Sequence, residues 1–294
     1  MSGRKISIAV CALVILAPGC ASRTIKAAPT SSAGSPDTYF TAPVPIGVKA
    51  DQPGFSTDSN GVYAGFDIDL AHYLADQLKF ARDSFQTVDD LNRASALGTR
   101  VRLVIATYSI TSDREAGTGG DPPVDFAGPY MKTPDGLLVK QNSALAHDKP
   151  DLTGRTICTL QGSTAAIADL PANIHKVSEP NYSGCVQDVE NGKADAVFTD
   201  WLILYGYAQD SAQYPGLVVE HTQYGSINQY GIGIPPGHSG ACQELVDKVT
   251  SFLKSDQWAT DFINEFPGIR QAEPNWQQDF RPQSDTVSKA SYCR

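Results

Sequence analysis

Short apolar runs alternate with amphipathic segments along most of the chain after position 45, and this alternation is typical of an α/β fold. The apolar runs predict strands at 46–48, 103–106, 137–140, 156–160, 194–198, 217–220 and 230–234. Helical periodicity of the apolar positions predicts helices over 67–79, 182–192, 239–254 and 256–266. The fold class predicted from this pattern is therefore α/β, with sheets flanked by helices.

The first residues follow a different pattern. Arg4 and Lys5 precede an apolar run over 6–17, which is too short to span a bilayer and has the length of a signal-peptide core. The run ends just before Cys20, and the order Leu-Ala-Pro-Gly-Cys resembles a bacterial lipoprotein signal, in which cleavage precedes a cysteine that becomes lipid-modified. We predict a signal peptide over 1–19 and lipidation, such as palmitoylation, at Cys20. Ordinary secretion is the alternative.

A low-complexity segment follows the predicted lipid anchor. Residues 20–45 are rich in Ala, Ser, Thr and Pro and offer little apolar surface to bury, which predicts a flexible tether. An anchor with a tether would hold the folded part at the extracytoplasmic face of the cell membrane.

Composition and charge narrow the classes of function. The chain has 294 residues, of which 41% are hydrophobic and 19% charged, so it is globular and long enough for two domains. Its formal net charge of −9 argues against nucleic acid as a partner. The five histidines are scattered without the spacing of metal ligands. We expect neither a metal ion nor another cofactor.

Cysteine usage agrees with export. Cys11 lies in the predicted signal peptide and Cys20 is the predicted lipidation site, so four cysteines remain in the exported chain. An even number in an exported protein predicts two disulfides, and we favour pairing between sequence neighbours over the two other connectivities. The favoured pairs are Cys158–Cys185 and Cys242–Cys293. A four-cysteine metal site is disfavoured because no CxxC pair is present.

Polar residues that suit an anionic or zwitterionic ligand follow three of the predicted strands. The strand at 103–106 leads through Thr107 and Ser109 to Arg114, whose guanidinium can bind a carboxylate in a bidentate manner. The strand at 156–160 leads to Gly162-Ser163-Thr164 and a predicted helix start, an arrangement that exposes backbone N–H groups to an anion. Asp200 follows the strand at 194–198, where open α/β sheets place ligand groups. The alternatives are an ordinary polar turn for Arg114 and helix capping for the hydroxyls.

Six motifs taken together give the chain a resemblance from about residue 46 to residue 266. It resembles the extracellular amino-acid-binding proteins of ABC importers, the polar amino acid family of solute-binding proteins. The motifs are GFDIDLA (65–71), ATYSITSDR (106–114), VDFAGPY (124–130), LTGRTICTLQGST (152–164), NGKADAVFTD (191–200) and YGIGIP (230–235).

The resemblance implies a type II periplasmic-binding-protein fold. Each of its two lobes is a mixed sheet flanked by helices, and two crossing segments join the lobes, here near 130–134 and 229–232. The first lobe would comprise 46–132 and 231–294, and the second lobe 133–230. Hinge closure would trap the ligand in the cleft between the lobes.

The resemblance also implies roles for the zwitterion-binding residues. Arg114 would clamp the ligand α-carboxylate, with support from Ser109, which also contacts the ammonium. The backbone carbonyl of Thr107 would accept from the ammonium, and Asp200 of the second lobe would pair with it. Gly162, Ser163 and Thr164 would bind an acid group of the ligand.

The side-chain specificity rests on Lys49. A lysine in this loop, IGVKADQPGF, is similar to the glutamate-binding branch of actinobacterial type, where the cation would neutralise a ligand side-chain carboxylate. The alternative is that Lys49 points to solvent. The aromatic residue that commonly stacks on the ligand is missing near Gln52, so Phe55 or Tyr108 could replace it. Residues 115–123 form an insertion that is either a surface loop or part of the cleft rim.

The predicted function is therefore transport rather than catalysis. We expect the substrate-binding component of an ABC importer, which captures glutamate, aspartate or one of their amides and delivers it to a permease with its ATPase. One alternative is an enzyme on the same fold, acting as a prephenate or arogenate dehydratase. Another is a ligand-sensing receptor module. Asp67 and Asp69, in the first turn of the helix predicted at 67–79, are interpreted as residues that stabilise the helix terminus.

Overall fold

The structure is a computed structural model that describes residues 38–168, 170 and 173–294. Contacts divide the chain after Pro36, and the unit from Asp37 to Arg294 contains all the helices and strands named below. The predicted signal peptide, Cys20 and most of the predicted tether lie outside the described residues. Among those described, no helix is both long and apolar enough to cross a bilayer.

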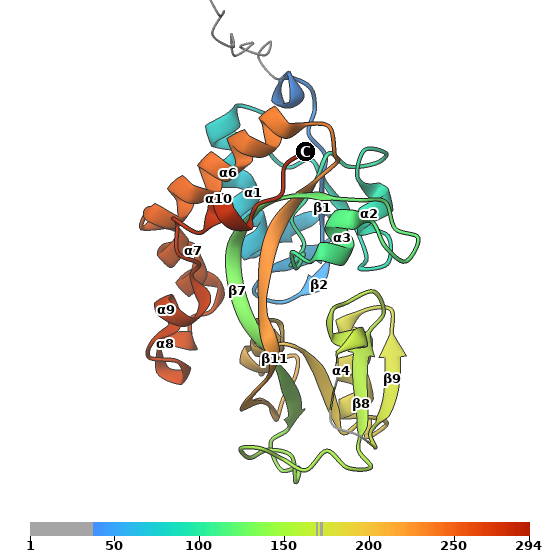
Figure 1. Cartoon of the computed structure of the whole chain (residues 1–294). Helices are drawn as coiled ribbons and strands as arrows, with labels where there is room; N and C mark the ends of the chain where they lie inside the picture. The colour runs from blue at the N-terminus through green and yellow to red at the C-terminus, as the bar shows by residue number, and fades with distance from the viewer. Residues whose placement is uncertain (1–37, 169, 171–172) are drawn as a thin grey trace, which may run out of the picture. The chain divides into compact units, whose positions relative to one another are not determined.

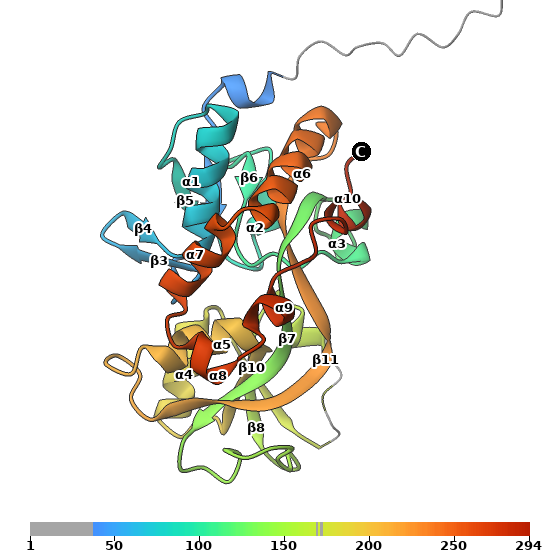
Figure 2. The ribbon, with the colours of Figure 1, turned by 90° about the vertical axis from the view of Figure 1, so that its left-hand side faces the viewer.

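A mixed sheet organises this unit. In the described part of the chain it has eight strands in the order β5-β1-β6-β11-β7-β10-β8-β9. Two long antiparallel strands, β7 (Asp125–Lys140) and β11 (Leu217–Ile234), lie side by side at its centre and run from one half to the other (Figures 1 and 2). The other strands are β1 (Ile46–Val48), β5 (Phe85–Thr87), β6 (Leu103–Val104), β8 (Thr156–Leu160), β9 (His175–Glu179) and β10 (Ala196–Asp200).

The sheet divides the elements into two halves. The first half contains β1, β5 and β6, with a small sheet formed by β2 (Asp51–Gln52), β3 (Ser56–Ser59) and β4 (Val62–Ala64). Its helices are η1 (Tyr39–Thr41), α1 (Phe66–Leu78), α2 (Arg93–Ala96), α3 (Ser112–Ala116), α6 (Ser239–Lys254) and α7 (Gln257–Glu265). The second half contains β8, β9 and β10 with η2 (Ala165–Ile167), α4 (Tyr182–Glu190) and α5 (Trp201–Gln209). A C-terminal segment adds α8 (Ile269–Ala272), α9 (Trp276–Phe280) and α10 (Val287–Ala290).

The two crossing segments pair with each other. Thr133 lies opposite Asn228, Lys132 opposite Gln229, and Met131 opposite Tyr230. The ladder shifts register on both sides of this stretch, as expected where two strands bend between halves. The connection between the halves is thus a two-stranded antiparallel ribbon.

Within the described residues, hydrophobic periodicity located α1, α4, α6 and α7, but it missed α5 and the shorter helices α2, α3, α8, α9 and α10. Helix α6 matches its predicted range, and α1, α4 and α7 differ by one or two residues at their ends. Most of the residues of α5 are buried, so its apolar positions do not follow the period of one face. The helix predicted after Thr164 is a single 3-10 turn, η2.

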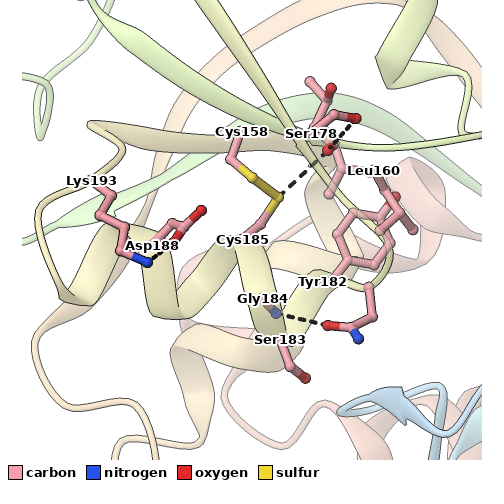
Figure 3. The surroundings of a disulfide bond; sticks show 12 residues. Cys158, Leu160, Ser178, Tyr182, Ser183, Gly184, Cys185, Asp188 and Lys193 are labelled. Atoms are coloured by element: carbon pink, nitrogen blue, oxygen red, sulfur yellow. Dashed lines mark hydrogen bonds and ion pairs between the residues drawn. A yellow bond between two sulfur atoms is a disulfide. The ribbon is translucent and has the colours of Figure 1, made fainter.

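Both disulfides join sequence neighbours, which is the favoured pairing. Cys158 of β8 is bonded to Cys185 of α4, and Cys242 of α6 is bonded to Cys293 (Figure 3 shows the first). The first disulfide fixes α4 to the strand that leads to Gly162. The second disulfide attaches the end of the C-terminal segment to α6 of the first half.

Buried and stacked aromatic side chains attach both ends of the described chain to the rest of the protein. In the C-terminal segment, the Trp276 ring stacks on Phe262 of α7 with centroids 5.2 Å apart, and Phe280 stacks on Trp201 of α5 at 5.5 Å. Near the start, Tyr39 and Phe40 are buried in the core. The predicted tether range of 20–45 thus includes residues from Tyr39 onwards that pack into the folded unit, because two aromatic side chains give this stretch a surface to bury.

Candidate functional site

Arg114 connects the two halves from the short helix α3. The hydroxyl of Thr111 caps this helix by accepting from the Arg114 backbone N–H at 3.3 Å. The guanidinium donates to the Ser109 carbonyl at 2.7 Å and, across the gap, to the Gly162 carbonyl at 3.2 Å. Burial lowers the pKa of Arg114 to about 10, so the side chain is still a cation at neutral pH. It also lies 4.9 Å from the ring centre of Tyr108.

Asp200 lies in the second half, at the end of β10, where α5 begins. It is 4% exposed, and its Oδ1 atom has no hydrogen-bond partner among the described residues. Burial raises the pKa of Asp200 well above its ordinary value, and the nearby Asp135 raises it further. The Tyr230 hydroxyl and Arg114 oppose this rise. Asp200 and Arg114 are therefore close enough to influence each other's ionisation.

Thr107 and Ser109 precede Arg114 in the chain, and both are buried. Thr107 has a left-handed backbone with φ of 45°, which is uncommon for a β-branched residue. Its N–H donates to the Asp67 carboxylate at 3.0 Å, and its hydroxyl donates to Gln52 Oε1 at 3.0 Å. The unusual backbone at Thr107 is thus held in place by two side chains from other elements.

Asp67 has a larger role than its position in the first turn of α1 predicts. It is fully buried and accepts hydrogen bonds from the Tyr130 hydroxyl at 2.8 Å and from the Thr107 N–H. Burial raises the pKa of Asp67 to about 7, although both hydrogen bonds act to lower it. Asp67 therefore holds the backbone at Thr107 and the side chain of Tyr130 rather than only the helix terminus.

Gly162, Ser163 and Thr164 follow β8. Gly162 has φ of 76°, and a Cβ atom there would lie 2.9 Å from the backbone carbon of Asp90, so the two halves touch at this glycine. The Ser163 hydroxyl donates to the Leu160 carbonyl at 2.7 Å and accepts from the Ala166 N–H at 3.1 Å. Thr164 precedes η2 without a side-chain cap. Since η2 is a single turn, an anion here would rely on N–H and hydroxyl groups rather than on a long helix.

Lys49 does not point to solvent. It is 2% exposed, and its ammonium is paired with the carboxylate of Asp90. The other oxygen of Asp90 accepts from Arg93 at 2.7 Å. Burial alone would raise the pKa of Asp90, but Arg93 and Lys49 outweigh it and hold that pKa below its usual range. Asp90 is thus a carboxylate held between two cations.

A cavity of about 310 Å³ adjoins Arg114 and the Gly162–Thr164 segment. Tyr108 lines it, and so do Thr118, Asp121 and Pro122 of the insertion. The insertion over 115–123 is therefore part of the cavity rim rather than a separate surface loop. Both rings are buried, but Tyr108 lines this cavity and Phe55 does not. Within the described residues, no group of His, Cys, Asp or Glu is arranged to hold a metal ion.

A family model assigns the chain on the basis of most of its length. The model of the bacterial extracellular solute-binding proteins, family 3, matches residues 44–266. The chain belongs to this family. It is accordingly a solute-binding protein rather than an enzyme, and the dehydratase alternative is wrong.

Relatives of this solute-binding protein include proteins named for the amino acids that they bind. The glutamate-binding protein GluB of Corynebacterium glutamicum is 31% identical over 237 residues, which cover 75% of this chain and 71% of the relative. The ABC transporter glutamine-binding protein GlnH of Bacillus subtilis is 27% identical over 232 residues, 76% of this chain and 81% of the relative.

Solved structures agree with the two-lobed fold. An ancestral arginine-binding protein bound to glutamine has a TM-score of 0.66 and 26% identity, over 75% of this chain and 96% of that one. The L-cysteine receptor of Neisseria gonorrhoeae, at 20% identity, has a TM-score of 0.69 over 84% of this chain and 98% of that chain, and this likeness concerns the fold alone. The solute-binding protein thus has the type II periplasmic-binding-protein fold.

Sequence reasoning missed several groups around the site of this solute-binding protein. Asp90 and Arg93 belong to a stretch without clear periodicity. Lys49, the other cation that pairs with Asp90, lies 41 residues earlier in the chain. Asp135 and Tyr230 lie on the long crossing strands β7 and β11. In a long, mostly apolar stretch, a single polar residue gives no signal of a functional role. The one available signal was the pair of acids at 89–90, which follows the buried Val88.

Proposed function

We propose that this protein captures an acidic amino acid outside the cell and delivers it to the permease and ATPase of an ABC importer. The observation that carries the proposal is the approach of Arg114 and Asp200 from opposite halves, with Asp200 Oδ1 lacking a partner among the described residues. A zwitterion supplies what each group lacks, namely a carboxylate for the guanidinium and an ammonium for the carboxylate. The glutamate- and glutamine-binding relatives support this ligand class.

The proposed binding mode uses groups from both halves. Arg114 binds the α-carboxylate while it keeps its bond to the Ser109 carbonyl. Asp200 and the Thr107 carbonyl accept from the ammonium, and Ser109 supports both ends of the zwitterion. Because the ligand bridges the halves, its binding favours the closed arrangement over an open one. We place the first lobe at 46–132 and 231–294 and the second lobe at 133–230.

The ligand side chain is proposed to meet Lys49. The lysine ammonium has three donor hydrogens, and Asp90 is its one side-chain acceptor among the described residues. A side-chain carboxylate or amide oxygen can accept another of these hydrogens, whereas an arginine or lysine ligand presents only donors. A charged acceptor forms the stronger bond. We therefore rank glutamate and aspartate above their amides, and place basic amino acids last. Gly162 and Thr164 contribute a second contact to an acid group of the ligand, and Ser163, whose hydroxyl bonds the Leu160 carbonyl and the Ala166 N–H, supports their position.

Calorimetric titration of the purified chain with individual amino acids tests this function. We expect binding of glutamate or aspartate, weaker binding of the amides and no binding of arginine. The variant Lys49→Met keeps the length of the side chain and leaves Asp90 paired with Arg93, so it should lose the preference for glutamate over glutamine. A folded chain that binds none of the amino acids would refute the proposal.

Membrane attachment completes the proposed role. The signal peptide over 1–19 and lipidation at Cys20 would fix the protein to the outer face of the membrane, with a tether that ends before Tyr39. The variant Cys20→Ser should then appear in the culture medium, while the reference chain stays in the membrane fraction. Equal distribution of the two chains would contradict the anchor without affecting the ligand site.

A further inference from the structure

A second contact joins the two halves on the side of Asp51. This residue lies on β2 in the small sheet of the first half. Its Oδ2 atom accepts hydrogen bonds from the backbone N–H groups of Tyr182 at 3.1 Å and of Ser183 at 3.4 Å, at the start of α4. Its backbone carbonyl accepts from the Tyr207 hydroxyl of α5. One residue of the first half thus binds two helices of the second.

The start of α4 has donors available for this contact. The first N–H groups of a helix lack partners within the helix. Asn181 caps α4 by accepting from the Gly184 N–H at 2.8 Å, and Figure 3 shows Tyr182 and Ser183 in the same first turn, near the disulfide. The carboxylate of Asp51 satisfies the two preceding donors and interacts favourably with the positive end of the helix. The capping of α4 is therefore completed by the other half of the molecule.

Gly206 marks the same contact from α5. A Cβ atom at this position would lie 1.9 Å from the Pro53 carbonyl oxygen, so the helix backbone rests directly on the loop that follows Asp51. Any other residue would force the loop and the helix apart. Helix α5 begins immediately after Asp200, so this contact also fixes the element that carries the proposed ammonium partner.

We propose that Asp51 is a positioning residue that stabilises the closed arrangement without binding the ligand. Its side-chain carboxylate already accepts from two N–H groups of α4. If the closed arrangement alone binds tightly, the apparent affinity is reduced by the fraction of molecules that are not closed. The contact of Asp51 with α4 and α5 then sets affinity from outside the ligand site. This inference rests on the proposed amino acid binding.

The test compares Asp51→Ala with the matched control Asp58→Ala. Asp58 is an exposed carboxylate on the adjacent strand β3, and it accepts from the Gly61 N–H within the first half. We expect Asp51→Ala to weaken glutamate binding about tenfold, mainly through faster dissociation, and Asp58→Ala to leave the affinity unchanged. Tyr207→Phe removes one hydrogen bond of the contact and should have a smaller effect in the same direction.

Gly206→Ala separates a closing contact from ordinary structural damage. Alanine favours a helix more than glycine does, so the ligand-free variant should unfold at the same or a higher temperature than the reference. The added methyl group nevertheless blocks the approach to Pro53, and we expect at least a tenfold loss of affinity. A loss of affinity without loss of stability would not arise from a merely structural role.

A ligand-independent measurement keeps the inference testable by itself. Spin labels at the exposed positions Gln77 and Gln187, each changed to cysteine, report the distance between α1 and α4. Asp51→Ala and Gly206→Ala should shift this distance to longer values in the ligand-free chain. Unchanged affinity and unchanged distances in Asp51→Ala would overturn the inference. A reference chain that binds no amino acid would instead refute the proposed function, and the distances alone would then decide the role of Asp51.

Discussion

The two charged sides of the candidate site differ in how far they are satisfied within the protein. On the first half, Arg114 donates to two carbonyls, and Lys49 and Arg93 share Asp90. On the second half, Asp200 is buried, yet its Oδ1 atom has no partner among the described residues. The cationic side is held in place before a ligand arrives, and the anionic side is not.

The chemistry of the side chains explains the difference. A guanidinium has five donors in a fixed plane, so Arg114 can keep bonds to backbone carbonyls and still offer donors to a ligand. A carboxylate only accepts, and burial without donors raises its pKa, as it does for Asp200. In the proposed binding mode, we therefore expect the ligand ammonium to change the ionisation of Asp200 more than the ligand carboxylate changes that of Arg114.

The largest expected effect comes from the pre-arranged side. Arg114→Ala should weaken amino acid binding on the order of 100- to 1,000-fold, since truncating one partner of a buried charge pair costs about 2–5 kcal/mol. Arg82→Ala is the control, because Arg82 is half-exposed and contacts only Asp76, at 3.5 Å, among the described acids. Calorimetry measures both variants. Retained micromolar binding in Arg114→Ala would refute the assignment of the carboxylate clamp.

Asp200→Asn sharpens the comparison because affinity and stability should change in opposite directions. Loss of the ammonium partner should weaken binding roughly 30- to 100-fold. The ligand-free variant should be about 1–3 kcal/mol more stable at alkaline pH, since it lacks a buried carboxylate with an unpaired oxygen.

The pH dependence of this gain follows from the raised pKa of Asp200. Protonated Asp200 stabilises the reference chain fully at pH values below about 3.9, the pKa of an aspartate in the unfolded chain. This stabilisation is lost as the pH rises through the higher pKa that Asp200 has in the folded chain. The difference between variant and reference should therefore vanish towards pH 4 and grow above it. Thermal unfolding at a series of pH values measures it, and a variant that is less stable at every pH would contradict the account.

Proton release on binding is the next smaller effect. The ammonium favours the charged form of Asp200, so binding should release up to one proton and affinity should rise with pH by at most about tenfold per pH unit. Titration in buffers of different ionisation enthalpy counts the protons. Asp135 and Asp67, with pKa values raised to about 6 and about 7 by burial, titrate in the same range. Asp200→Asn should remove the release if it comes from Asp200, and undiminished release would assign it to the other two.

The smallest effect separates the two hydroxyls after Gly162. The Ser163 hydroxyl is already used within its own half, so Ser163→Ala should cost about 1 kcal/mol of stability and change affinity little. Thr164 borders the cavity without a side-chain cap, so Thr164→Ala should weaken binding severalfold at unchanged stability. Thermal unfolding and calorimetry on both variants test this, and the reverse pattern would exchange the two roles.

Local sequence patterns predicted the frame of the molecule better than its polar contacts. The amphipathic period located α1 and α6, and the end of β8 located Gly162. The bond between Asp67 and Thr107 spans 40 residues and leaves no periodic signal in either segment. The contact of Asp51 with Tyr182, 131 residues away, depends on how the two halves meet and is not visible in any one motif.

A crystal structure of the protein with L-glutamate tests the central claim most directly. The account predicts the α-carboxylate within about 3 Å of the Arg114 guanidinium and the ammonium within about 3 Å of the Asp200 carboxylate, both ordinary hydrogen-bond distances. The side-chain carboxylate should then approach Lys49. Glutamate bound elsewhere, or bound in this cleft with its ammonium away from Asp200, would contradict it.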